Sequence, residues 1–287
     1  MVQARIIKIV SKEYTLLLES GEIVKAYLTG KIRLQKTPVA GDLVECMESS
    51  GQWIVQKLLP RKTFLIRPAC ANVDQALIVM SIKDPDFSPV LIDRISFLIC
   101  NAGIEPVLVV TKCDLGIPDD VEEMIQEYEK GPMRVIRAGR GMATEALEEV
   151  LAGKISVLTG QSGAGKSSLL NELEPTFHLA TQEISKALGR GKHTTRHNEL
   201  HKVAGGLVAD TPGFSSLDFS KIKKEELAGC VMDFRPYLGQ CKFNDCVHQN
   251  EPGCVVKEAV EAKRIPERRY RNYLDVLKMI QMRREKF

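Results

Sequence analysis

GQSGAGKS, at residues 160–167, has the full pattern of a phosphate-binding loop. Its residues are Gly160, Gln161, Ser162, Gly163, Ala164, Gly165, Lys166 and Ser167. An apolar run at 155–158 precedes the loop and a helical pattern covers Lys166–Leu173, so the loop joins a strand to a helix. In such a loop, backbone N–H groups and the helix N-terminus bind phosphate oxygens, the lysine reaches the outer phosphates, and the serine ligates Mg²⁺. These residues therefore predict an α/β nucleotide-binding fold.

A second motif, TKCD, lies earlier in the chain after an apolar run at 107–110, and its residues are Thr111, Lys112, Cys113 and Asp114. A carboxylate accepts hydrogen bonds from both N1–H and the exocyclic amine of guanine, and adenine has no such pair, so Asp114 selects GTP over ATP. The apolar stem of Lys112 would cover the face of the base. Thr111 stands where most GTP-binding proteins have Asn, which leaves its bond toward the base and the phosphate loop an open question.

A third motif, DTPG, occupies residues 210–213 after the apolar run Gly206–Ala209. In this position Asp210 holds the water shell of Mg²⁺, and the Gly213 N–H senses the γ-phosphate. Many GTPases place next a Gln that orients the attacking water, and this chain has Phe214 there. A phenyl ring cannot orient water, so hydrolysis needs another residue for that task.

Residues 188–197, LGRGKHTTRH, predict a polar switch loop. Thr195 is the candidate for a second protein ligand of Mg²⁺. His193 is the candidate for the water-positioning group, because a neutral imidazole can orient a nucleophile near pH 7. A lone histidine in a polar loop is more often simply solvated, and both interpretations of His193 stay open on the residues alone.

The three motifs occur in a permuted order. In an ordinary GTPase the phosphate loop comes first and the base-reading tetrad last, whereas here TKCD precedes GQSGAGKS. Because domain termini lie at the surface and often close together, a Rossmann-like sheet can be reopened at another loop with its contacts unchanged. We therefore expect residues 66–218 to form a circularly permuted GTPase domain with a parallel sheet. A kinase or ATPase with the same loop is the competing interpretation, and it predicts equal affinity for ATP and GTP.

Smaller domains are expected on either side of this one. Residues 1–65 contain five short apolar runs separated by Gly and Pro, which predicts an OB-fold barrel, whose usual ligands are oligonucleotides. An SH3-like barrel without a ligand is the alternative. Residues 219–287 contain Cys241, Cys246, His248 and Cys254, enough for one closed tetrahedral zinc site. We expect a structural ion that stabilises a mainly helical segment too small for its own core.

The composition is that of an ordinary globular protein, with 44% apolar and 27% charged residues. No run approaches the ~20 apolar residues of a membrane span, and the eight cysteines come without a secretion signal, so we expect a cytoplasmic protein with reduced thiols. The net charge is +3, but residues 263–287 hold nine Lys or Arg against three acidic residues. Such a run is more often a solvated helix face than a binding surface.

As a set, the motifs resemble the RsgA/YjeQ family, the circularly permuted bacterial GTPases of small-ribosomal-subunit assembly. The resemblance rests on the barrel, TKCD, GQSGAGKSS, GRGKHTT, DTPG and the Cys₃His cluster, in the family's arrangement. It implies GTP hydrolysis stimulated by the small subunit, contact with its ribosomal RNA, a role in late maturation, and a nucleotide contact by Ser168. It also implies that His193 replaces the missing Gln. We expect a monomer without a membrane partner; a nucleotide-gated RNA-binding module with little hydrolysis is the alternative.

Overall fold

The computed structural model describes residues 1–28, 37–66, 69–174, 199–209 and 217–284. The chain divides into two compact units. The first consists of residues 1–76, 144–159 and 166–213, and the second of residues 77–143, 160–165 and 214–287. Within the described ranges, no helix is both long enough and apolar enough to cross a bilayer.

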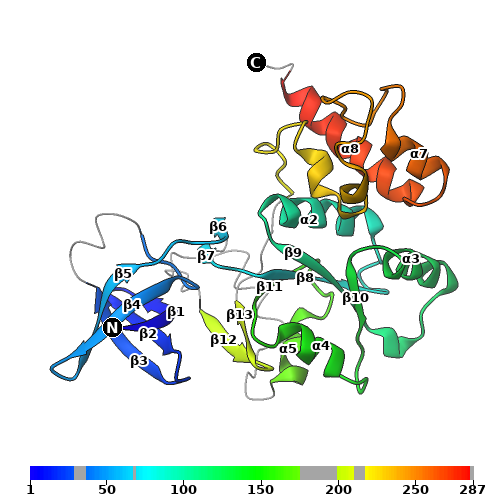
Figure 1. Cartoon of the computed structure of the whole chain (residues 1–287). Coiled ribbons are helices and arrows are strands. Elements are labelled where there is room, and N and C mark those ends of the chain that lie inside the picture. The colour runs from blue at the N-terminus through cyan, green and yellow to red at the C-terminus, as the bar shows by residue number, and fades with distance from the viewer. Residues whose placement is uncertain (29–36, 67–68, 175–198, 210–216, 285–287) are drawn as a thin grey trace. The chain divides into compact units, whose positions relative to one another are not determined.

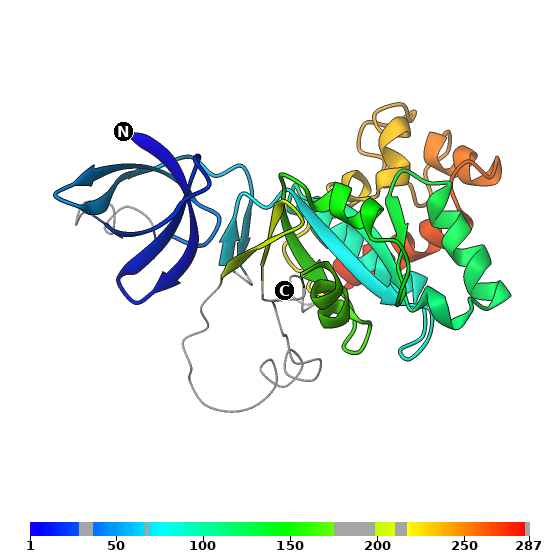
Figure 2. The same ribbon diagram turned by 90° about the horizontal axis from the view of Figure 1, so that it is seen from below.

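Five strands of the first unit close into a barrel in the order β1-β2-β3-β5-β4, drawn in shades of blue in Figure 2. The strands are β1 (Val2–Val10), β2 (Glu13–Leu18), β3 (Ile23–Leu28), β4 (Leu43–Ser49) and β5 (Gln52–Leu58). Tyr14, Leu16 and Leu18 alternate inward along β2, as the two-residue period of a strand requires. Strand β3 pairs in parallel with β5, and β1 pairs antiparallel with β4 to close the barrel. The closed five-stranded barrel confirms the predicted OB-type fold.

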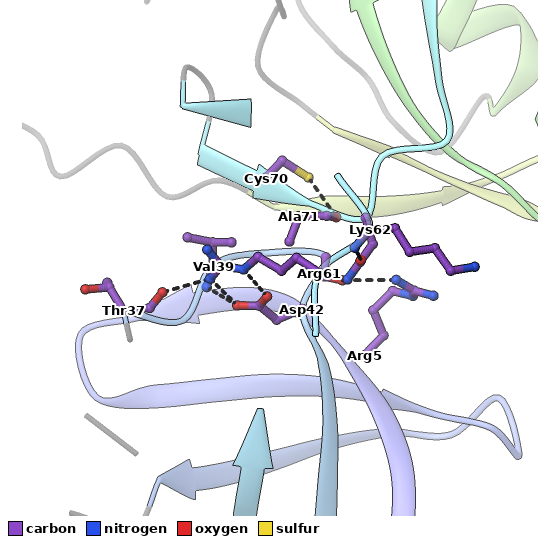
Figure 3. A network of polar contacts seen from close by, with 10 residues as sticks. Arg5, Thr37, Val39, Asp42, Arg61, Lys62, Cys70 and Ala71 are labelled. Atoms are coloured by element: carbon purple, nitrogen blue, oxygen red, sulfur yellow. Dashed lines mark hydrogen bonds and ion pairs between the residues drawn. The ribbon is translucent and has the colours of Figure 1, made fainter. Parts of the chain in front are cut away.

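A buried ion pair fixes the end of the barrel (Figure 3). Arg61 Nε donates to Asp42 Oδ1 at 2.6 Å, and the second guanidinium nitrogen donates to Oδ2 at 2.8 Å. Beside this pair Gly41 has φ +90°, and a Cβ there would overlap the carbonyl oxygen of Ala71. Only glycine fits this position. The chain then forms a hairpin of β6 (Phe64–Ile66) and β7 (Ala69–Ala71).

A six-stranded sheet has the order β10-β9-β8-β11-β13-β12. Its strands are β8 (Gln75–Ser81), β9 (Glu105–Thr111), β10 (Arg134–Arg137), β11 (Ile155–Thr159), β12 (Leu200–Val203) and β13 (Gly206–Ala209). The pairings of β10 with β9 and of β11 with β13 are parallel, as predicted. Edge strand β12 is an addition to that prediction and runs antiparallel to β13. Its four residues, LHKV, are too few to show a strand period.

Helices alternate with these strands, as expected for an α/β fold with a parallel sheet. They are α2 (Pro89–Asn101), α3 (Asp119–Glu129), α4 (Glu145–Leu151) and α5 (Lys166–Leu173). Ser88 caps α2 by accepting the Leu91 N–H at 3.3 Å, and Pro89 takes the first helical position. All residues of β8 are buried, which is typical of a strand in a parallel sheet. The α/β class is therefore confirmed.

The C-terminal segment, in the second unit, is mainly helical and packs against α2 (Figure 1). Its elements are η3 (Leu227–Cys230), η4 (Met232–Tyr237), α7 (Val255–Glu261) and α8 (Glu267–Arg284). The rings of Phe234 and Tyr273 are fully buried with centroids 4.9 Å apart, and they share a core with Phe97 of α2. The segment thus completes its core with residues of α2.

A buried polar network joins this segment to α2 and α3. Arg269 of α8 is 3% exposed, with its Nε 2.9 Å from Asp93 Oδ1 and its NH1 2.7 Å from Asp233 Oδ2. Tyr128 of α3 donates its hydroxyl to Asp93 at 2.8 Å, and Asn272 donates to the other Asp93 oxygen at 2.6 Å. One arginine therefore neutralises two buried carboxylates on different elements, α2 and η4.

Candidate nucleotide site and metal centre

The phosphate loop follows β11, and its backbone path requires its glycines. Gly160 has φ +125°, and a Cβ there would overlap the carbonyl oxygen of Val79. Gly163 and Gly165 have φ +82° and +92°, a region that side chains disfavour. The glycine spacing of the motif is thus imposed by the local backbone, which supports the interpretation of residues 160–167 as a phosphate loop.

Thr111 links the base-reading tetrad to the phosphate loop. It ends β9, is 5% exposed, and donates its Oγ1 hydroxyl to the carbonyl oxygen of Ala164 at 2.6 Å. The threonine hydroxyl therefore makes the bond toward the phosphate loop that the sequence leaves open. Two motifs 53 residues apart in the chain are in direct contact through it.

Asp114 lies in a short 3-10 turn, η1 (Cys113–Leu115), directly after β9, and is exposed. Its Oδ1 accepts the N–H of Arg140 at 3.0 Å. Gly139 fits beside it because a Cβ there would lie 2.6 Å from that same oxygen. No motif marks residues 139–140 in the sequence, but they follow β10, which pairs in parallel with β9. Ligands of such sheets bind at this carboxyl edge.

Lys112 takes the left-handed conformation, with φ +62°, and is partly buried. Its ammonium group donates to the main-chain carbonyl oxygens of Lys83, at 3.1 Å, and of Asp84. Lys83 and Asp84 come after β8, so a third strand end contributes to the site. Their sequence carries no signal that would have identified them.

Helix α5 starts with Lys166, Ser167 and Ser168, all in the first unit. Ser167 is buried and Ser168 is exposed. Burial lowers the pKa of the Lys166 ammonium, because desolvation disfavours its charge. The other predicted residues of the nucleotide site lie outside the described residues, and they are Asp210, Gly213, His193 and Thr195.

The four predicted metal ligands gather in the C-terminal segment, where the ligand atoms of Cys241, Cys246, His248 and Cys254 all lie within 4.8 Å of one another. His248 Nδ1 is 3.5 Å from the sulfurs of Cys241 and Cys246 and 3.3 Å from that of Cys254. The sulfurs of Cys241 and Cys254 are 3.9 Å apart. Tetrahedral zinc with Zn–S of about 2.3 Å places two sulfurs about 3.8 Å apart, and a sulfur and a nitrogen about 3.6 Å apart. The cluster therefore fits a zinc ion.

Contacts around the cluster hold its loop in place. The Glu251 carboxylate accepts the N–H groups of Val247 and Gln249, both at 2.8 Å, and the Tyr270 hydroxyl donates to the carbonyl of His248, also at 2.8 Å. Burial lowers the pKa of His248, which favours the neutral imidazole that a metal ion requires. Glu251 and Tyr270 carry no sequence signal of this role, since it depends on the folded loop.

The basic residues near the C-terminus are partly engaged within the protein. Arg269 belongs to the buried network, Arg271 forms an ion pair with Glu267, and Arg283 lies 3.2 Å from Asp218. Arg268 NH1 also lies 3.9 Å from Glu127 Oε1, so four of the basic residues have acidic partners. The net positive charge that residues 263–287 can present to a ligand is therefore smaller than the count along the sequence suggests.

Comparisons with known proteins give one consistent result. Residues 58–220 match the family model described as RsgA GTPase. A relative from Oceanobacillus iheyensis, named small ribosomal subunit biogenesis GTPase RsgA 2, is 44% identical over 294 residues and 100% of both chains. A relative from Geobacillus sp., named small ribosomal subunit biogenesis GTPase RsgA, is 43% identical over 295 residues and 100% of both chains.

Solved structures agree with the sequence relatives. YloQ, described as a circularly permuted GTPase, matches with a TM-score of 0.83 and 35% identity over 99% of this chain and 96% of that one. YjeQ from Thermotoga maritima matches with a TM-score of 0.85 and 36% identity over 98% of both chains. These matches confirm the permutation inferred from the motif order and support a GTP-hydrolysing enzyme. The chain belongs to the RsgA GTPase family.

Proposed function

We propose that this protein hydrolyses GTP as an assembly factor in late maturation of the small ribosomal subunit. Its full-length relatives are named small ribosomal subunit biogenesis GTPases. The Thr111 to Ala164 hydrogen bond of 2.6 Å carries the GTP-binding part of the proposal, because it joins the base-selecting tetrad to the phosphate loop. The protein acts as a monomer in the cytoplasm, where it binds the subunit and its ribosomal RNA.

Guanine is bound at the carboxyl end of β9. Asp114 accepts hydrogen bonds from N1–H and the exocyclic amine, while the Arg140 N–H, 3.0 Å from its Oδ1, orients the carboxylate. The Lys112 stem covers the ring, and the two carbonyl oxygens that bind its ammonium group keep it there. Cys113, between these residues, contributes the backbone of the turn.

The phosphates are bound by the backbone of Gly160–Gly165 and the start of α5. Lys166 would neutralise the outer phosphates, Ser167 would ligate Mg²⁺, and Ser168 would contact the nucleotide. Mg²⁺ would supply charge neutralisation between the phosphates. From their motifs alone, Thr195 and Asp210 would complete the magnesium shell and Gly213 would contact the γ-phosphate.

His193 positions the attacking water. The motif after Asp210 offers Phe214 in place of Gln, and a neutral imidazole is a suitable substitute. His193→Ala should therefore lower the hydrolysis rate stimulated by small subunits about 100-fold while nucleotide affinity stays unchanged. A stimulated rate that survives the substitution, measured under single-turnover conditions, would contradict this role.

The domains divide this work. Residues 1–65 form an RNA-binding barrel, residues 66–218 the GTPase domain, and residues 219–287 a domain stabilised by one structural zinc ion. The closed Cys₃His geometry leaves no open coordination position, so zinc supplies folding free energy and takes no part in hydrolysis.

Co-sedimentation tests the partner. The purified protein is centrifuged with small or large ribosomal subunits in the presence of a non-hydrolysable GTP analogue, of GDP, or without nucleotide. We expect binding to small subunits only, and tighter binding with the GTP analogue than with GDP. Equal affinity in the two nucleotide states would rule out a GTP-controlled assembly factor.

Base selection has its own test. Asp114→Asn replaces one acceptor by a donor, so the variant should lose affinity for GTP about 100-fold and gain affinity for XTP, whose C2 position carries an oxygen. A gain for XTP cannot come from unfolding. If the variant binds GTP as wild type does, the assignment of Asp114 to the base is wrong.

Phe214 favours a second candidate, a nucleotide-gated RNA-binding module that hydrolyses GTP very slowly. Single-turnover hydrolysis with and without small subunits separates the two functions. The enzyme requires a rate that rises on the subunit; the module requires RNA binding that depends on GTP with no such rise.

A further inference from the structure

The connection between β8 and α2, here called the β8–α2 turn, touches both halves of the candidate nucleotide site. On one side, the carbonyl oxygens of Lys83 and Asp84 accept hydrogen bonds from the Lys112 ammonium group. On the other side, a Cβ on Gly163 would lie 3.6 Å from Pro85 Cδ, so the turn is in contact range of the phosphate loop. One short segment without a motif thus borders the tetrad and the phosphate loop.

Ser81 fixes the shape of this turn. It is the last residue of β8, is 0% exposed, and donates its hydroxyl to the carbonyl of Pro85 at 2.7 Å. The next residue, Ile82, donates its N–H to the carbonyl of Thr111 at 3.2 Å. The bond from Ser81 closes a loop of four residues, and the two carbonyl groups that bind Lys112 lie inside it. Without the hydroxyl, the far end of the turn loses this attachment.

The position of Lys112 matters because its stem is flexible. A lysine side chain loses up to about 2 kcal/mol of conformational entropy when it is ordered. Two carbonyl acceptors on its ammonium group already restrict the rotamers of Lys112, so less entropy is left to lose when a base binds against the stem. Anything that holds those acceptors in place therefore raises nucleotide affinity.

We propose that Ser81 is a positioning residue for guanine-nucleotide binding. It holds the β8–α2 turn so that the carbonyl groups of the turn place the Lys112 side chain over the base. The inference rests on the proposed nucleotide site, and Ser81 itself touches no reacting atom. It follows that Ser81 supports GDP and GTP binding equally and leaves kcat at saturating GTP unchanged.

Ser81→Ala tests the proposal by fluorescence titration with labelled GDP and GTP analogues. Affinity for each should fall about 5-fold, which corresponds to the loss of about one net hydrogen bond. In a Lys112→Ala background the same substitution should change affinity less than about 2-fold, because its effect passes through Lys112. Ser96→Ala is the matched control: Ser96 is also buried in the second unit and donates to the Asp93 carbonyl at 2.9 Å. It should leave nucleotide affinity unchanged.

Two results would overturn the proposal: wild-type affinity in Ser81→Ala, or an equal loss in both backgrounds, which would mean that Ser81 acts only through general stability. Should Ser81→Ala not fold, Ser81→Cys keeps a similar volume with a weaker hydrogen-bond donor. Its nucleotide affinity must also fall, and the loss must likewise depend on the presence of Lys112. Asp114→Asn separates this inference from the site assignment. If that variant also binds GTP normally, the nucleotide site itself is misplaced.

Discussion

Replacing Arg269 with methionine should loosen the C-terminal segment without unfolding the barrel. Methionine keeps much of the apolar volume but leaves Asp93 and Asp233, 0% and 7% exposed, without their shared cation. Removing one partner of a buried ion pair costs about 3–5 kcal/mol. Two carboxylates lose their cation here, but Tyr128 and Asn272 still donate to Asp93. We therefore expect a loss of about 4 kcal/mol in the opening free energy of this segment.

Hydrogen exchange with mass spectrometry measures this loss locally. A decrease of about 4 kcal/mol should accelerate exchange in peptides from α8 and η4 about 1,000-fold. The chain has one tryptophan, Trp53, which lies on β5 of the barrel. Its fluorescence during urea unfolding reports on the barrel and should not change. An acceleration of less than 10-fold in α8, or an equal change in the barrel, would refute the reasoning that this network holds the segment on α2 and α3.

The pH dependence of stability and a second substitution, Asp93→Asn, test the same mechanism. Burial raises the pKa of Asp93, and Arg269 opposes this effect in the wild type. In Arg269→Met the folded-state pKa of Asp93 therefore rises further above its unfolded value. The destabilisation is then present at neutral pH and shrinks as the pH falls through the raised pKa toward the unfolded value of about 4. Adding Asp93→Asn should likewise restore part of the stability; a double variant as unstable as the sum of the singles would contradict the mechanism.

Three further outcomes are expected. Thr111→Val removes the 2.6 Å hydrogen bond to the phosphate loop, so calorimetry should show about 10-fold weaker binding of GTP and GDP alike; unchanged affinity would refute the link. Cys254→Ser, or a chelator, should release one zinc ion per chain. Hydrogen exchange should then become faster in the C-terminal segment and stay unchanged in the barrel. Gly41→Ala should destabilise the barrel by about 2 kcal/mol or more, because φ is +90° and a Cβ there would overlap the carbonyl oxygen of Ala71. Urea unfolding monitored by Trp53 fluorescence measures this loss. The control Gly51→Ala, at φ +74° with open space around it, should cost less.

Local signals in the sequence account for most of the fold. The helix Lys166–Leu173 begins and ends where predicted, because the phosphate loop marks its start. The buried strands are continuous apolar runs bounded by polar turns, and such runs are typical of parallel sheets. Strand β12 was not predicted, because two of its four residues are polar and its extended conformation depends on pairing with β13.

The parts of the site that the sequence does not indicate are made by tertiary contacts. The Arg140 N–H and the carbonyl groups of Lys83 and Asp84 act through the main chain, so their residue types carry no record of the role. Position 139 requires glycine because a side chain there would collide with the Asp114 carboxylate. The two residues are 25 positions apart in the sequence, and only the order of the strands brings them together. Arg269 counts as surface charge in the sequence, yet it is buried because carboxylates on two other elements surround it.

The described contacts also limit how the nucleotide can act on the C-terminal segment. The segment shares its core with α2 and its buried network with α3, and these helices follow the β8–α2 turn and the Asp114 turn, respectively. Within the described residues, this route therefore starts at the proposed base-binding turns and, through Pro85, beside Gly163 of the phosphate loop. GTP and GDP present the same base and the same α- and β-phosphates, so we expect the route to transmit occupancy and not to distinguish the two nucleotides. A response specific to GTP has to enter through a γ-phosphate contact. We propose that the DTPG motif at 210–213, which the C-terminal segment follows closely in the sequence, provides this contact.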